Sequence, residues 1–225
     1  MVLTWSEGSA RCSTGIRIED FAPEIIIIRF EDSDWGQVQR SYTRQNLYGA
    51  DNLRPDEQTR YWAKIWHVIS HGQIPAHGLT WHADYTIPYR FFFPANNVAV
   101  YDHLADRPEL FASARLVFLT GKLISPRCMA TLRGLVEGGL TVVAPSHLAP
   151  AGMSVDASAP YMEYPVGKGR WVICDDVTAD PVRRLLAPYL GRGDELRYVF
   201  GRREVIFTAP DNPASLGVTV RERAL

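Results

Sequence analysis

The chain has 225 residues, enough for one large domain or for one domain with a small appendage. It carries 24 basic and 25 acidic side chains, and this balance leaves no overall field to attract nucleic acid or an anionic membrane. Apolar runs are only a few residues long, and Met1 is followed by polar residues, so we expect a cytoplasmic protein without a membrane anchor.

The first half of the chain predicts an arm followed by two secondary-structure elements. Residues 1–23 show no period and are expected to form an N-terminal arm. Residues 24–30, with four consecutive isoleucines, predict a buried strand. A helix is predicted over residues 55–71, because apolar residues recur there at helical spacing, and residues 98–114 are expected to be partly helical.

The centre of the chain reads as strand, helix and strand. Residues 116–119 are uniformly apolar, as in a strand that is buried on both faces of a parallel sheet. Ser125 is a suitable helix cap with Pro126 behind it, and Gly138 and Gly139 end the predicted helix. Residues 140–144 predict a second buried strand, so this unit is expected to be a right-handed crossover.

The last third of the chain changes in pattern. Residues 161–175 predict a hairpin, with Gly167 and Gly169 supplying its turn, and a helix is expected from Asp180 to Gly191. Three short runs with a period of two follow and predict a small antiparallel tail. We therefore expect an α/β fold with a mainly parallel sheet, helices on both faces and a small antiparallel β tail, divided into residues 1–23, 24–192 and 193–225.

These motifs resemble those of the glutamine-amidotransferase-like domain of β-galactosidases and related glycoside hydrolases. The residues that carry the resemblance are Ser125, Leu132, Val136, Glu137, Gly138 and Gly139 before a buried strand, and Gly167, Lys168 and Gly169 in the hairpin. The resemblance implies a flavodoxin-like or amidotransferase-like sheet. In that family the domain follows the catalytic barrel and helps to build the trimer. The resemblance implies a trimerisation-type domain without the barrel and its two catalytic carboxylates, because the 225 residues are already used by this domain.

Ligands of open parallel sheets bind beyond the carboxyl ends of the strands. This rule predicts a crevice lined by Asp34, Trp35, Asp84, Tyr85, Thr120, Gly121, Ser146, His147, Asp175 and Asp176.

Ser146 and His147 are the candidate catalytic pair, since they follow a core strand where amidotransferase-like hydrolases carry a nucleophile. A strained elbow needs small residues two positions before and after the nucleophile, and Leu148 does not satisfy this requirement. No histidine follows His147, whereas the amidotransferase pattern needs one downstream. A loop serine that bonds to backbone groups is the competing interpretation.

His67 and His71 are spaced i, i+4, by which one helix offers two imidazoles to a metal ion. Zinc is therefore an alternative to the expectation of no cofactor, and a polar helix face is the simpler interpretation. Cys12, Cys128 and Cys174 are odd in number and far apart, which favours reduced thiols.

The preferred hypothesis is a non-catalytic assembly or accessory domain that contacts its own copies or a barrel-bearing subunit and contributes to a carbohydrate site. One alternative is a small hydrolase that uses Ser146 and His147, with a metal ion at the histidines. The other is a small-molecule binding domain that uses the same crevice.

Overall fold

The computed structural model describes residues 22–29, 57–74, 76, 94–105, 107–200, 202–208 and 217–222. In chain order the elements are β1 (Ile25–Arg29), α2 (Glu57–Ile69), β2 (Asn97–Tyr101), the 3-10 helices η3 (Asp102–Leu104) and η4 (Pro108–Phe111), β3 (Leu116–Thr120), α3 (Pro126–Gly138), β4 (Thr141–Ala144), η5 (Ser146–Leu148), β5 (Met162–Val166), β6 (Gly169–Ile173), α4 (Asp180–Leu190), β7 (Glu195–Phe200), β8 (Arg203–Thr208) and β9 (Gly217–Glu222). None of the helices in these ranges has the length and apolar character needed to cross a bilayer.

Six strands form the central sheet in the order β2-β1-β3-β4-β6-β5. The first five run parallel, and β5 pairs antiparallel with β6. This order reverses direction between β1 and β3, as in doubly wound α/β folds, so the carboxyl ends of the parallel strands meet at one edge. The predicted α/β class with a mainly parallel sheet is confirmed.

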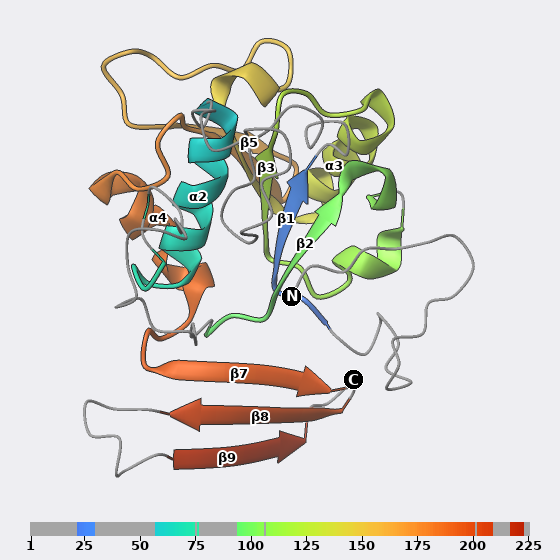
Figure 1. Cartoon of the computed structure of the whole chain (residues 1–225). Coiled ribbons are helices and arrows are strands. Elements are labelled where there is room, and N and C mark those ends of the chain that lie inside the picture. Colours follow the sequence, from blue (N-terminus) through green and yellow to red (C-terminus); the bar gives the residue numbers. More distant parts are fainter. Residues whose placement is uncertain are drawn as a thin grey trace, which may run out of the picture.

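Helices cover both faces of this sheet (Figure 1). On one face, α2 and α4 pack on alternate strand residues that include Ile25, Ile27 and Phe118. On the other face, α3 and the 3-10 helices pack on the intervening residues, which include Ile26 and Ile28. Because both faces are covered, all five residues of β1 are buried, which explains why its sequence is an apolar run instead of an alternating one.

The α3 helix begins and ends as its sequence predicts. The Ser125 hydroxyl accepts a hydrogen bond from the Cys128 N–H at 3.3 Å, and Pro126 occupies the first turn. At the other end, Gly139 has a φ of 126°, and its N–H donates to the Val136 carbonyl. These contacts satisfy backbone groups that a helix end otherwise leaves unpaired.

The β5–β6 hairpin lies against the C-terminal end of α3. The Lys168 N–H donates to the Glu137 carbonyl at 3.0 Å, and the Arg170 N–H donates to the Leu140 carbonyl at 3.2 Å. A β carbon on Gly169 would lie 2.2 Å from the Leu140 carbonyl oxygen, closer than real contacts allow. Gly167 and Gly169 therefore form the turn of the hairpin and also let it approach the end of α3 closely. This contact brings together the two motifs that carry the sequence resemblance.

The strand β2 was not predicted. Residues 98–114 were expected to be helical in part, and the 3-10 helices η3 and η4 do lie there, but Asn97–Tyr101 forms β2. Val98 and Val100 are buried against the α3 face of the sheet, so tertiary pairing with β1 decided the conformation of this short apolar segment. The predicted N-terminal arm lies outside the described residues, apart from 22 and 23.

The last three strands form a separate antiparallel sheet in the order β7-β8-β9, as the sequence predicts. This sheet lies below the central one in Figure 1. Its anchor is Arg197, which donates to the Glu24 carboxylate at 2.6 Å and also pairs with Glu204. Burial acts to lower the pKa of Arg197, but the two carboxylates outweigh it and raise that pKa, so this side chain stays charged.

Candidate functional site

Polar residues from three strand ends come together at the carboxyl edge of the central sheet. Gly121 follows β3, Ser146 and His147 follow β4, and Asp175 follows β6, and hydrogen bonds join these loops in pairs. The topological rule thus places these four predicted residues in one neighbourhood, although they are up to 54 positions apart in the sequence.

Asp175 binds Ser146 through both carboxylate oxygens. The Ser146 backbone N–H donates to Oδ1 at 2.7 Å, and the Ser146 hydroxyl donates to Oδ2 at 2.7 Å. Ser146 is the first residue of η5, so the carboxylate satisfies a backbone N–H that this helical turn leaves unpaired. The contact ties the loop after β4 to the loop after β6.

His147 points to a different partner. Its Nε2 lies 2.8 Å from the Gly121 carbonyl oxygen, to which it donates its proton in this arrangement. With its proton on Nε2 the imidazole can accept a hydrogen bond at Nδ1, but the Ser146 hydroxyl donates to Asp175 instead. The imidazole therefore ties the loop after β4 to the loop after β3.

A serine hydrolase needs its nucleophile hydrogen-bonded to a base that a third group orients. Here the serine bonds directly to a carboxylate, and the histidine bonds to a carbonyl on another loop. The two predicted catalytic side chains are thus close in sequence but do not form a nucleophile and base pair. Their contacts have the character of loop-fixing hydrogen bonds.

Thr120, another predicted crevice residue, is buried and donates its hydroxyl to the Ile28 carbonyl at 3.2 Å. It contributes to the contact between β3 and β1 and does not line an open crevice. The remaining predicted crevice residues Asp34, Trp35, Asp84 and Tyr85 lie outside the described residues.

Asp176 is held by a turn and by α2. Its Oδ1 accepts from the Thr178 backbone N–H and hydroxyl, and the Lys64 ammonium lies 3.1 Å away. Burial acts to raise the pKa of Asp176, but the hydrogen bonds from Thr178 and the contact with Lys64 outweigh it and lower that pKa. This carboxylate is suited to fixing the start of α4, and it is not a general acid at neutral pH.

The two described cysteines are core residues. Burial raises the pKa of Cys128 and of Cys174 to about 12 in each case. The Tyr61 hydroxyl donates to the Cys174 carbonyl at 3.2 Å, and burial raises the pKa of this phenol well above its usual value. A thiol acts as a nucleophile only as the thiolate, so neither cysteine is suited to catalysis.

Sequence reasoning missed two buried charged residues at this edge. Arg29 ends β1 and is only 6% exposed, with its guanidinium 5.1 Å from the centre of the Trp62 ring. Asp102 follows β2, is 4% exposed, and accepts a hydrogen bond from the Ser125 N–H at 3.1 Å. The available signal was a charged residue at the end of an apolar strand or directly after it, and Arg29 after four isoleucines shows it clearly.

The two candidate zinc ligands do not share a helix face. The α2 helix ends at Ile69, and His71 lies beyond it with a left-handed φ of 52°. The His67 Nδ1 lies 2.7 Å from the Ile74 carbonyl, and the His71 Nε2 lies 3.3 Å from the Leu190 carbonyl. Within the described ranges, no group of three or more His, Cys, Asp or Glu residues could hold a metal ion.

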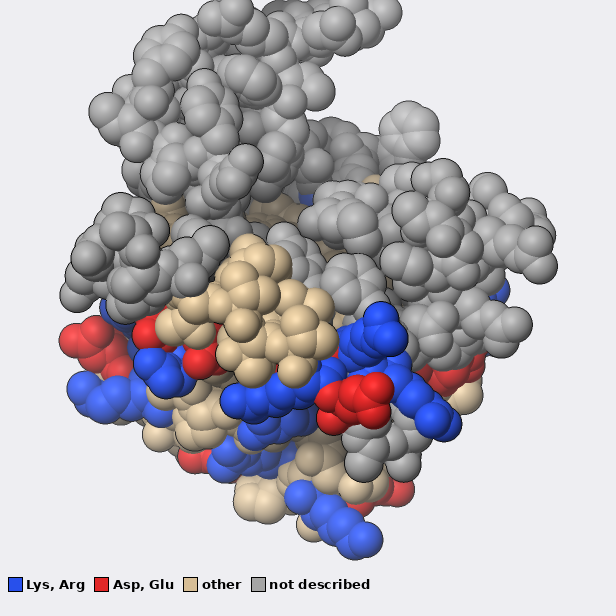
Figure 2. All heavy atoms as spheres, turned by 90° about the horizontal axis from the view of Figure 1, so that it is seen from below, with Lys and Arg blue, Asp and Glu red and all other residues tan. Residues whose placement is uncertain are grey.

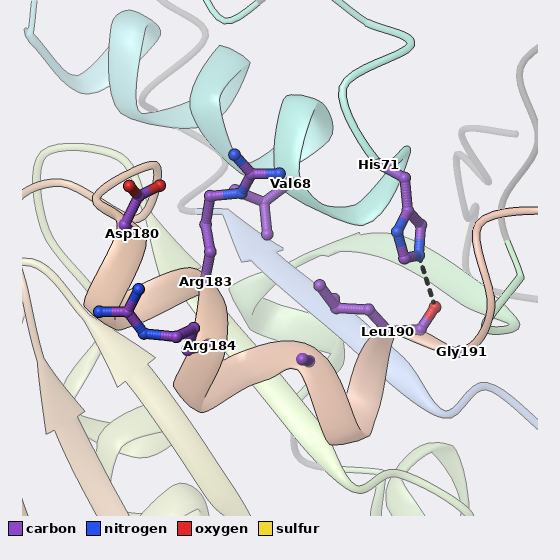
Figure 3. Close-up of a pocket in the computed structure, with 8 residues that line it drawn as sticks. Val68, His71, Asp180, Arg183, Arg184, Leu190 and Gly191 are labelled. Carbon is purple, nitrogen blue, oxygen red and sulfur yellow. Dashed lines mark hydrogen bonds between the residues drawn. The ribbon is translucent and has the colours of Figure 1, made fainter.

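A surface groove with a volume of about 440 Å³ lies between α2 and α4 (Figure 3). Its lining residues are Val68, His71, Asp180, Arg183, Arg184, Ala187, Leu190 and Gly191. The guanidinium groups of Arg183 and Arg184 point to different sides of α4 in Figure 3. They do not converge on one position, as two arginines that clamp one anionic group would.

No family model and no curated protein matches this sequence. Among solved structures, the chain is similar to a catalytic mutant of Gan42B, a GH42 beta-galactosidase from G. stearothermophilus, with a TM-score of 0.43 and 11% identity over 83% of this chain. A second structure of Gan42B gives a TM-score of 0.42, also at 11% identity and 83% coverage. The chain spans 34% of the length of the Gan42B chain in each of these structures. At this identity the likeness is one of fold alone, a distant one to a glycoside hydrolase.

Proposed function

We propose that this chain is a non-catalytic accessory domain that joins subunits, as the sequence resemblance to the trimerisation-type domain of β-galactosidases implies. The observation that carries the proposal is the arrangement at the carboxyl edge. The hydroxyl of Ser146 and the imidazole of His147 are both engaged in contacts that fix loops. An active site would hold these two groups against each other.

Further support comes from how the loops are held. Asp175 binds the backbone of Ser146 as well as its side chain, and His147 binds a backbone carbonyl. Hydrogen bonds to backbone groups fix the conformation of the loops. The proposed role of this edge is to present fixed loops to a barrel-bearing glycoside hydrolase subunit, whose carbohydrate site the loops border.

The small-hydrolase alternative is tested by measuring hydrolysis of 4-nitrophenyl acetate and 4-nitrophenyl β-galactoside by the full chain. We expect any rate to be the same for the wild type, Ser146→Ala and His147→Ala. A rate that falls by orders of magnitude in Ser146→Ala while the variant remains folded would overturn the non-catalytic proposal.

The assembly role is tested separately by light scattering over a wide range of protein concentration. We expect a mass above that of the 25.3 kDa chain, either for the chain alone at high concentration or after co-expression with a barrel-bearing subunit. A strictly monomeric chain that also leaves such a subunit unbound would contradict the assembly role.

A further inference from the structure

The small β7-β8-β9 sheet exposes an apolar strip. Val218 and Val220 on β9 are 56% and 62% exposed, and Leu123 is the one other large hydrophobic side chain in the described residues that is so exposed. Scattered apolar side chains are normal on a protein surface, but two on one strand face are a patch.

The strand register makes this patch continuous across the sheet. Val218 lies opposite Phe207, and Val220 lies opposite Val205, so these four side chains share one face. Phe207 in turn lies opposite Leu196 on β7. The apolar strip therefore runs from β7 to the outer edge at β9.

The other face of the same sheet is turned toward the body of the protein. Glu204 and Ile206 point to that side and are 5% and 7% exposed. Arg197 lies opposite Ile206, shares its face, and binds Glu24 next to β1. Because this anchor holds one face against the central domain, the valine face is turned outward.

The β9 strand is also an open edge. It pairs with β8 on one side, and no strand in the described ranges pairs with its other side. All six of its residues are exposed. An edge strand offers a row of unpaired backbone N–H and C=O groups, which is a template for another strand.

The charges of this region limit what that strand can be. In Figure 2, which views the molecule from the side of this sheet, basic side chains are interspersed with acidic ones around uncharged residues. Arg221 and Glu222 lie opposite Glu204 and Arg203 of β8, so the charges of β9 already face opposite charges within the sheet. The rest of β9, residues 217–220, is uncharged. A partner strand with a net positive or net negative charge would therefore find no net opposite charge on β9. A neutral, valine-rich strand matches its uncharged, apolar residues.

We propose that β9 pairs antiparallel with β9 of a second copy of this chain, about a two-fold axis at Thr219. This pairing sets Val218 opposite Val220 twice, so four valines form one row that joins the apolar strips of both copies. Arg221 then lies opposite Gly217, and no like charges face each other. The inference rests on the proposed function, because it names the surface by which copies of the domain associate.

Neighbouring registers fit less well. A shift that sets Val220 opposite itself places Glu222 beside Val218, and a further shift sets Arg221 opposite Arg221, which is repulsive. A pairing that turns one copy over places the two valine faces on opposite sides of the joined sheet. Of these pairings, the one at Thr219 unites the valines and separates the charges.

The expected dimer is weak. A single short strand with two valines buries less area than the roughly 1,600 Å² of a standard stable interface. We therefore expect association that rises with protein concentration, and a test that captures transient pairs is the sharpest one.

Disulfide trapping tests the register. In a Cys12→Ser background, Thr219→Cys is expected to cross-link to itself under mild oxidation. A mixture of Val218→Cys and Val220→Cys is expected to give mixed dimers several-fold more abundant than the homodimers of either variant. Cys128 and Cys174 do not interfere, because burial holds their pKa values at about 12.

Sedimentation velocity of the full chain tests whether β9 is the surface by which two copies associate. Val220→Lys is expected to abolish the concentration-dependent rise in sedimentation coefficient, while the matched control Leu123→Lys, at an exposed apolar residue in the loop between β3 and α3, leaves it unchanged. Both positions are exposed, so neither substitution is expected to prevent folding.

The outcomes separate this inference from the proposed function. If the chain associates but Val220→Lys has no effect and neither cross-link forms, β9 pairing is wrong and assembly by another surface stands. A chain that stays monomeric and gives no cross-link also overturns β9 pairing, and the assembly role then depends on the co-expression test. Hydrolysis that depends on Ser146 would overturn the non-catalytic role whatever the state of association.

Discussion

Gly169→Ala probes the contact between the β5–β6 hairpin and α3, which unites the two motifs of the sequence resemblance. A β carbon at this position would lie 2.2 Å from the Leu140 carbonyl oxygen and 2.3 Å from that of Val136. Both neighbours are backbone atoms of the helix end, so no flexible side chain can move aside. The hairpin itself would have to move away from α3 by roughly 1 Å to restore ordinary contact distances.

Two terms set the size of the effect. Forcing an extra carbon into a packed site destabilises a protein by about 1–3 kcal/mol. The shift would also stretch the hydrogen bonds from the N–H groups of Lys168 and Arg170 to the carbonyls of Glu137 in α3 and Leu140 just after it, which are 3.0 and 3.2 Å long and contribute about 1 kcal/mol each. We expect Gly169→Ala to lower the free energy of unfolding by about 2–5 kcal/mol, a large share of a typical total of about 5–15 kcal/mol.

Urea unfolding followed by circular dichroism measures this loss. Gly134→Ala is the matched control, because Gly134 lies within α3 and a β carbon added there would meet nothing within 4 Å. That change is expected to stabilise the protein by about 0.5–1 kcal/mol through helix propensity. If Gly169→Ala unfolds at the same urea concentration as the wild type, the close approach of hairpin and helix is not as described.

Three further predictions concern the carboxyl edge and the thiols. Asp175→Ala removes the acceptor of both Ser146 hydrogen bonds, and we expect it to lower the free energy of unfolding by about 1–2 kcal/mol; an unchanged urea midpoint would argue against the loop contact. The lowered pKa of Asp176 stabilises the folded protein above the usual aspartate pKa of about 3.9, and this stabilisation is lost as the pH falls through the folded pKa. The difference in unfolding free energy between the wild type and Asp176→Asn should therefore be largest near neutral pH and smaller in acid, and a difference that does not change with pH would refute this. In a Cys12→Ser background, Cys128 and Cys174 should resist Ellman's reagent at neutral pH until urea unfolds the chain, and rapid labelling of the folded variant would contradict their burial. Their raised pKa values also predict that stability falls as the pH rises above the usual thiol pKa of about 8.5.

Much of the architecture could be predicted because neighbouring residues encode it. The four isoleucines of β1, the Ser125 cap with Pro126, and the turn of the β5–β6 hairpin each specify their element through local sterics and hydrogen bonding. The segment that became β2 has no such signal. It is short and apolar, and its pairing with β1 decided its conformation.

The candidate site was also predictable only in part. A strand followed by a polar residue is visible in the sequence, and parallel strands bring their carboxyl ends to one edge, so Ser146, Asp175 and Gly121 could be predicted to be neighbours. The hydrogen-bond partners could not be predicted. Asp175 accepts from the hydroxyl of Ser146, and the Gly121 carbonyl accepts from the imidazole of His147, and both contacts depend on how three loops pack together.

The sequence by itself determined the α/β class, the mainly parallel sheet and the antiparallel tail, because hydrophobic period, caps and turns act over a few residues. Only the tertiary structure decided that His71 lies beyond the end of α2 and that Gly169 touches a helix end. It also decided that Val218 and Val220 face outward, because Arg197 and Glu24 hold the opposite face of their sheet against the body. These contacts join residues far apart in the chain, so they depend on the packing of whole elements and have no local signature.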